Sequence, residues 1–534
     1  MRLPQASYKN RGTTFIQQFL GYDHNLRTQA GEFYDMNNMA MDNYPVISTR
    51  QGEEDMLALY GNPNGLWEYA PDTLMAVSGN LLRIGITKTS RGEILPEVSQ
   101  YLTDSEKSFA TIGAYTVIMP DKVIFDADKK TLSNIVRSFT STAYGGQYLV
   151  MQIIPCDIDG KTIEYEEQPE DTPPEDQSKY WYDTTNNVYK KYSTSEEAWI
   201  TMESPYVKMI PRISASESAY VSPEGALNEQ AVKDKKALSD FFEGFSPLDT
   251  ITYSGTQDAS PDDKELWTDY IVYGTGKEDG TNYIILSMIE VKKIASFTVR
   301  TKCPDLDHLV ALNNRIWGVS NSTHEIFACK LGDPTQWFNY AGIASDSYAI
   351  SLGFADEVTA SVAYNNYIHF FTEDKVIKIY GDYPSNYQMH TTKADGVISG
   401  GHDTVVNVEG ILYYVSPIGV MRYDGSMPYF CGQKFAPNFL AGKKVAAGRD
   451  GMKYCLSVSK NGQSEGVFVL DTQYGLWAKG GDQIFVKTAD LGSALCFMNP
   501  QGHLITLANR ERKTDAVVIA GENIFSEDRE EVSW

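Results

Sequence analysis

Residues 367–380 read YIHFFTEDKVIKIY, two aromatic and β-branched runs separated by a short polar turn. Such runs favour half-buried strands, and the turn between them is typical of a hairpin. The pattern recurs at residues 81–86, 115–125, 315–326, 411–423, 452–469 and 494–507. The last five pairs begin roughly 40–50 residues apart, the period of a propeller blade with four short strands. Because one hairpin cannot bury its apolar face whereas a ring of blades can, the recurrence predicts a mostly β protein, a β-propeller of about six to eight blades.

A change in composition divides this repeat. Residues 164–177 read EYEEQPEDTPPEDQ, an acidic and proline-rich stretch typical of a solvated loop or hinge. Residues 222–245 predict a helix, with Ser222 as N-cap, Pro223 in the first turn and Gly244 at its end. A helix with flanking strands in the middle of a blade repeat indicates an α+β module inserted at a blade loop.

The sequence therefore predicts four parts. They are an N-terminal arm and linker (1–60), the first part of the propeller (61–145), the inserted α+β module (146–300), and the second part of the propeller with a C-terminal tail (301–534).

Charge and cysteine content limit the classes of function that this protein can have. The chain carries 70 acidic and 46 basic residues, a net charge of −24, and shows no basic stripe that would hold a nucleic acid. This charge can serve solubility, or it can give a surface that repels a polyanion and lets DNA pass without sticking.

The six cysteines are widely spaced with no CxxC pair, which predicts buried, reduced thiols in a chain folded in a cytoplasm. No stretch of about 18 apolar residues occurs, so we expect no transmembrane helix.

Motifs of catalysis and cofactor binding are missing from the sequence. Gly276-Lys277 and Gly442-Lys443 lack the glycine spacing and the following Ser or Thr of a phosphate loop. No HExxH or GxSxG occurs. The seven histidines are scattered and are interpreted as core or edge residues of strands. We expect no enzymatic activity, no cofactor and no metal site.

Three segments resemble a known family. The first is the arm, with Phe19-Leu20-Gly21, Gly31-Glu32-Phe33, Asn37-Asn38-Met39 and Tyr44-Pro45-Val46 followed by Arg50. The second is residues 245–255, FSPLDTITYSG, and the third is residues 312–338, which end in GDPTQWF. Together they resemble propeller-containing tail-nozzle or tail-tubular proteins of short-tailed bacteriophages and related prophage structural proteins.

The resemblance implies a structural protein of the phage virion, assembled in the cytoplasm of the host bacterium. Such a protein would form a multimeric ring, commonly a hexamer, at the nozzle of the tail. Double-stranded DNA would pass through the ring during ejection without specific binding. Tail adaptors, tubular proteins and fibres would dock on the ring.

Two sets of residues are candidates for these contacts. The arm is expected to be tied down by the ring or by a neighbouring subunit, where it would pair at an open strand edge. Its candidate contact residues are Phe15, Phe19, Phe33, Tyr34, Tyr44 and Arg50. An acidic lumen or rim would repel the phosphates of the passing DNA and so lower the friction on the DNA. Its candidates are Glu164, Glu166, Glu167, Glu170, Asp171, Glu175 and Asp176.

Two other functions remain open at this point. A tail-tip or baseplate propeller adhesin would bind host-surface glycans through exposed aromatic side chains on one face of the propeller. A propeller glycoside hydrolase would need acidic residues that converge in space, and substitution of a single Asp or Glu would abolish its turnover.

Overall fold

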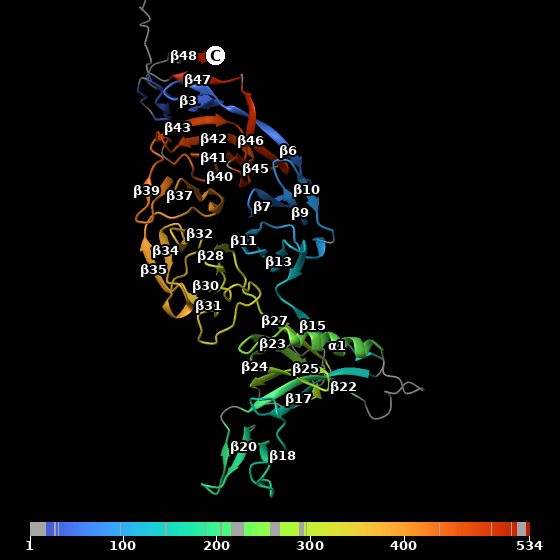
Figure 1. Cartoon of the computed structure of the whole chain (residues 1–534). Coiled ribbons are helices and arrows are strands. Elements are labelled where there is room, and N and C mark those ends of the chain that lie inside the picture. Colours follow the sequence, from blue (N-terminus) through green and yellow to red (C-terminus); the bar gives the residue numbers. More distant parts are fainter. Residues whose placement is uncertain are drawn as a thin grey trace, which may run out of the picture.

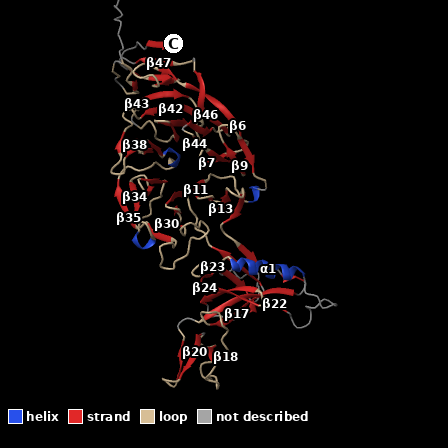
Figure 2. Cartoon of the chain, viewed as in Figure 1, coloured by secondary structure: helices blue, strands red, loops and turns tan. Residues whose placement is uncertain are grey.

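The fold is given by a computed structural model of the 534-residue chain. It describes residues 18–25, 28–29, 31–96, 98–141, 143–144, 147–186, 188–202, 205–214, 229–256, 268–287, 293–294, 296–436, 438–492, 494–513, 515–520 and 530–533. Figure 1 shows a ring of small sheets with a second body below it, and Figure 2 shows that strands dominate both. No helix among the described residues is long and apolar enough to cross a membrane.

The described residues form a seven-bladed β-propeller, which confirms the predicted fold class. Each blade is a four-stranded antiparallel sheet, and the seven predicted strand pairs fall within these blades. Blades 1 to 3 are β7 (Pro63–Ala70), β8 (Thr73–Ser78), β9 (Leu81–Ile86), β10 (Arg91–Ile94); β11 (Ser108–Ile112), β12 (Tyr115–Met119), β13 (Val123–Asp126), β14 (Thr131–Asn134); β28 (His308–Leu312), β29 (Arg315–Ser320), β30 (Glu325–Ala328), β31 (Tyr348–Ser351). Blades 4 to 6 are β32 (Ala360–Tyr364), β33 (Tyr367–Phe371), β34 (Lys375–Tyr380), β35 (Gln388–Lys393); β36 (Val406–Val408), β37 (Ile411–Ser416), β38 (Gly419–Tyr423), β39 (Tyr429–Phe430); β40 (Lys444–Asp450), β41 (Lys453–Lys460), β42 (Gln463–Asp471), β43 (Leu476–Gly481).

Blade 7 joins the two ends of the chain. Its inner strands are β44 (Lys487–Leu491), β45 (Ala494–Met498) and β46 (His503–Arg512), and its outer strand is β6 (Gln51–Ala58). The pairing begins at His503 opposite Ala58. Residues 51–58, expected to be part of a linker, are therefore the strand that closes the ring.

Local sequence explains the tight turn between the first two strands of several blades. In blades 3 and 4 this turn is Asn313-Asn314 and Asn365-Asn366, and all four residues have φ between 49° and 62°. Two consecutive left-handed residues make the hairpin turn whose twist matches that of the strands, and Asn tolerates this conformation better than most residues.

The insertion leaves the propeller after blade 2 and returns before blade 3. It runs from Ser138 to Thr301, whereas the sequence placed it at 146–300. Its main sheet contains β15 (Ser138–Thr140), β16 (Ala143–Tyr144), β17 (Gln147–Cys156), β22 (Tyr206–Ser214), β23 (Thr250–Thr256), β24 (Thr268–Glu278), β25 (Thr281–Ser287), β26 (Lys293–Ile294) and β27 (Ser296–Thr301). Helix α1 (Glu229–Glu243) packs Leu238 and Phe242 against this sheet. The proposed cap at Ser222 and Pro223 lies outside the described residues.

A small four-stranded sheet stands at the end of the insertion, between β17 and β22. It contains β18 (Tyr165–Gln168), β19 (Tyr180–Asp183), β20 (Val188–Ser193) and β21 (Ala198–Thr201). We call residues 157–202 the tip. Figure 1 places β18 and β20 at the end of the molecule farthest from β3.

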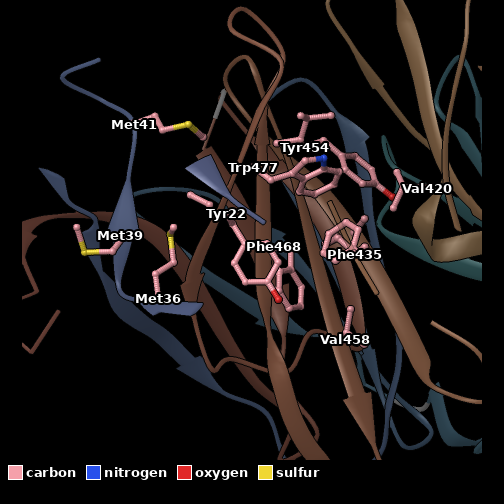
Figure 3. Close-up of a cluster of buried hydrophobic side chains, with 14 of the residues drawn as sticks. Tyr22, Met36, Met39, Met41, Val420, Phe435, Tyr454, Val458, Phe468 and Trp477 are labelled. Atoms are coloured by element: carbon pink, nitrogen blue, oxygen red, sulfur yellow. The ribbon is translucent and has the colours of Figure 1, made fainter. Parts of the chain in front are cut away.

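The arm packs on blade 6 together with the C-terminal strands. It forms β1 (Gly21–Tyr22), β2 (Glu32–Phe33), β3 (Asp35–Asn37), β4 (Met39–Ala40) and β5 (Ser48–Thr49), and β3 pairs with β47 (Val517–Ala520), which pairs with β48 (Glu530–Ser533). Figure 3 shows arm side chains such as Tyr22 and Met36 beside Phe468 and Trp477 of blade 6, in one buried cluster. The described arm is thus held by the propeller of its own chain.

Smaller features complete the fold. Three short 3₁₀ helices are η1 (Val98–Gln100), η2 (Pro384–Asn386) and η3 (His402–Thr404). All six cysteines are free; five are buried and Cys431 is half-buried.

Candidate functional site

A cavity lies along the axis of the propeller. The first strand of each blade faces it, and its volume is about 760 Å³. Four of these strands carry ionisable groups at or just before their first residue. Glu106 precedes β11, His308 opens β28, His402 and Asp403 precede β36, and Lys487 opens β44.

Four of these side chains contact one another at the wall of the cavity and form what we call the channel latch (Glu106, His402, Asp403 and Lys487). The Lys487 ammonium donates hydrogen bonds to Glu106 and, at 2.6 Å, to Asp403 Oδ2. His402 Nε2 lies 3.2 Å from Glu106 Oε1 and 3.3 Å from Asp403 Oδ2. The latch therefore links blades 2, 5 and 7 by charge.

The pKa values of the latch follow from this geometry. The hydrogen bond from His402, strengthened by Lys487 and opposed by burial, holds the pKa of Glu106 well below its usual range. Burial alone would lower the pKa of Lys487, but the carboxylates of Asp403 and Glu106 raise it above its usual value. Burial, together with nearby His402, lowers the pKa of His308 to about 4. Lys487 is therefore a cation and His308 is neutral near pH 7.

The latch also has the donor atoms of a metal site. One atom each of Glu106, His402 and Asp403 lies within 4.8 Å of the others. However, Lys487 Nζ is close to all three, at 3.4 Å from His402 Nε2, and only 5% of this lysine is exposed. The ammonium thus takes the position of a cation between the two carboxylates and offsets one of their two negative charges.

No local sequence motif marks the channel latch. Its members come from residues 106, 402, 403 and 487, and His402 was interpreted as a core or edge histidine. The one usable signal is positional, because each member lies at or just before the first strand of a blade. This pattern can be recognised only when the first residue of each blade is known, and the structure is needed to locate those residues.

The candidate contact residues of the arm touch their own chain. Phe19 and Phe33 are buried with ring centroids 5.8 Å apart, and Tyr44 stacks on Tyr474 of blade 6 at 4.2 Å. Tyr34 stacks on His24 at 4.1 Å.

Arg50 donates to Asn38 Oδ1 at 2.9 Å and pairs with Glu53. Phe15 lies outside the described residues. The arm is thus tied down by the ring, and its contact with a neighbouring subunit stays a prediction.

The seven candidate acids all lie in the tip or at its base. Glu166 and Glu167 belong to β18, Glu164 precedes it, and the other four lie in the loop before β19. Glu166 pairs with Lys179 at 2.8 Å. None of the seven lines the cavity of the propeller. Their position on the lumen of a multi-subunit ring stays a prediction.

The insertion is fixed to blade 3 by a buried polar contact. Asn339 donates to Asp249 Oδ1 at 2.7 Å, and the two residues are 2% and 1% exposed. Thr250 donates to the carbonyl of Phe338 at 2.8 Å, and Lys302 lies over the Phe338 ring at 4.9 Å. Burial raises the pKa of Asp249. A buried contact of this kind fixes the orientation of the two bodies.

No protein-family model and no curated protein matches this sequence. Several solved propeller structures are similar at low identity. Virginiamycin B lyase from Staphylococcus aureus is 8% identical, with 86% of this chain and 98% of that chain covered and a TM-score of 0.28. BamB from Moraxella catarrhalis is 9% identical, with 69% and 95% covered and a TM-score of 0.27. AztD from Citrobacter koseri is 9% identical, with 54% and 95% covered and a TM-score of 0.26. Similarity at this level carries no argument about activity.

Proposed function

We propose that this protein is a structural component of a bacteriophage tail. Copies of the chain, about six, form a ring at the tail nozzle through which DNA is ejected and on which adaptors or fibres dock. The observation that carries the proposal is the position of the three sequence segments with phage-tail resemblance. They fall on the two junctions that fix the arm and the insertion to the propeller.

The arm segment supports the proposal through its backbone requirements. Gly21 has φ +93°, and a Cβ there would lie 2.7 Å from the Trp477 carbonyl oxygen. Asn38 adopts φ 54°, and its side chain accepts a hydrogen bond from Arg50. These residue types are therefore the ones that this docking geometry needs.

The other two segments support it by meeting each other. Asp249 and Thr250 belong to FSPLDTITYSG, and Phe338 ends the third segment. Their hydrogen bonds join the insertion to blade 3. A resemblance that falls on such junctions concerns the assembly of parts and favours an architectural role over a catalytic one.

The DNA conduit in this proposal lies between copies of the chain. A cavity of about 760 Å³ has the size of a small-molecule pocket, and the channel latch joins three blades at its wall. A net charge of −24 disfavours tight binding to the phosphates of DNA. A conduit through which DNA passes needs such weak binding.

Light scattering of the purified chain, with negative-stain imaging, tests the proposal. We expect a closed ring with a central hole and a mass about six times the 59.6 kDa of one chain. The ring should bind neither duplex DNA nor cell-wall glycans at physiological salt. A chain that stays monomeric at tens of micromolar, or that binds or cleaves a glycan, would contradict the proposal.

A further inference from the structure

The tip has the construction of a docking module. Its four strands carry aromatic side chains on both faces, and it belongs to none of the large hydrophobic clusters. On one face Tyr189 contacts Tyr165 and Tyr182, with ring centroids 5.8 and 4.8 Å apart. The aromatic rings of the tip bury one another, so that Trp181 and Tyr189 are buried whereas Ile200 is exposed.

The two edges of the tip sheet differ in chemistry. β18 at one edge carries Glu166 and Glu167, and Glu166 is already paired with Lys179 of the same chain. β21 at the other edge reads Ala-Trp-Ile-Thr, without charge or proline, and Ile200 is 42% exposed. Among the described residues, no strand pairs with the outer edge of β21. This edge is open to a fifth strand.

The charge of the tip indicates which kind of segment binds at the open edge of β21. The tip carries twelve acidic residues and four lysines, a net charge of −8. Residues 1–17 carry Arg2, Lys9 and Arg11 and no acid, and the first acidic residue of the chain is Asp23. A cationic segment is attracted to an acidic surface and is steered toward it from solution.

We propose that the tip accepts residues 1–17 of a second copy of this chain, which add to β21 as an extended strand. This inference rests on the proposed ring, for which it supplies a contact between subunits. The arm at β3 and the tip at β18 and β20 lie at opposite ends of the molecule (Figure 1). A contact between opposite ends is heterologous, and heterologous contacts generate rings when the rotation closes.

Peptide binding to the full chain lacking residues 1–17 tests the inference. The probe is a fluorescein-labelled peptide of residues 1–17, followed by anisotropy at about 50 mM salt. We expect saturable binding that weakens at least tenfold when Glu196→Lys and Glu197→Lys reverse the charges just before β21. Both residues are exposed, so these changes leave the fold intact.

Matched control variants distinguish binding at the edge of β21 from general electrostatic attraction to the acidic tip. Glu170→Lys with Asp171→Lys makes the same change of charge in the loop before β19, and should weaken binding only about two- to threefold. A peptide with Arg2→Glu, Lys9→Glu and Arg11→Glu should fail on the parent chain and regain binding on the Glu196→Lys, Glu197→Lys variant.

The outcomes separate this inference from the proposed function. Equal binding to both pairs of lysine variants, or no binding up to about 100 µM peptide, overturns the docking site. If the chain lacking residues 1–17 still forms rings by light scattering, the docking role is wrong while the tail-ring proposal stands. If the peptide binds as expected and the full chain self-associates into open chains or dimers in place of a closed ring, the docking site is supported and the ring is contradicted.

Discussion

Lys487 is held where a bound cation would lie. Its ammonium donates hydrogen bonds to Glu106 and Asp403, and His402 completes the group. We expect Lys487→Met to lower the free energy of unfolding by about 1–3 kcal/mol, because two carboxylates lose their partner. The same change should create a zinc site with three protein ligands, detected by calorimetric titration with Zn²⁺.

The double variant Lys487→Met, Glu106→Gln is the control for this effect. It keeps the vacated volume but replaces one ligand, so its zinc affinity should fall at least tenfold below that of the single variant. If Lys487→Met binds zinc no more tightly than the parent chain, the interpretation of the latch as a filled cation position is wrong.

His369 makes the stability of blade 4 depend on pH. It is 1% exposed among Tyr364, Phe371 and Tyr423, and burial, reinforced by Lys378, lowers its pKa to about 4. In the unfolded chain the pKa is about 6.5, so the unfolded state takes up the proton first as pH falls. The stability is fully present above pH 6.5 and is lost toward pH 4, by roughly 3 kcal/mol.

Urea unfolding between pH 7 and pH 4 measures this loss. Acidic side chains also titrate here, so the comparison is with His369→Phe, which keeps the ring but removes the proton site. The gap in stability between the two chains should shift in favour of the variant as pH falls. A constant gap would show that His369 is not the titrating group.

At the level of elements, local signals were predicted well and distant pairings were not. The hairpin at residues 367–380 was predictable because its two strands and their turn are neighbours in sequence. The closing strand β6 was missed because its partner β46 lies at the other end of the chain and because QGEEDMLA lacks clear alternation. The channel latch was missed for the same physical reason, since three blades contribute its members.

The insertion should be removable as a unit. Ser138 faces Arg300 in the ladder between β15 and β27, and Thr301 N donates to the Arg137 carbonyl at 2.9 Å. We expect replacement of residues 139–299 by Asn-Gly, a tight hairpin turn, to leave a folded propeller. Circular dichroism and a cooperative thermal transition measure this.

An isolated insertion, residues 138–301, provides the complementary test. Its buried cluster around Leu238, Phe242 and Val207 is separate from the cores of the blades. A propeller that aggregates without the insertion, while the isolated insertion folds, would show that the Asp249–Asn339 contact is required for folding of blade 3.

At the scale of the whole molecule, ring closure rests on one strand pair. His503 lies opposite Ala58 where β46 meets β6. A disulfide formed by Ala58→Cys and His503→Cys would close the ring covalently and should raise the free energy of unfolding by about 2–4 kcal/mol. Urea unfolding of the oxidised and the reduced variant measures the gain. Equal stability in both states would show that unfolding does not begin at this seam.

The pairing of β46 with β6 also determines when the ring can close during synthesis of the chain. Strand β6 leaves the ribosome early, and its partner β46 follows roughly 450 residues later, about 20–90 s at ordinary rates of translation. During this wait β6 is an unpaired edge, and its run Glu53-Glu54-Asp55 guards it against pairing with the wrong chain. A ribosome that stops before β46 releases a chain that cannot close, so synthesis itself withholds incomplete subunits from assembly.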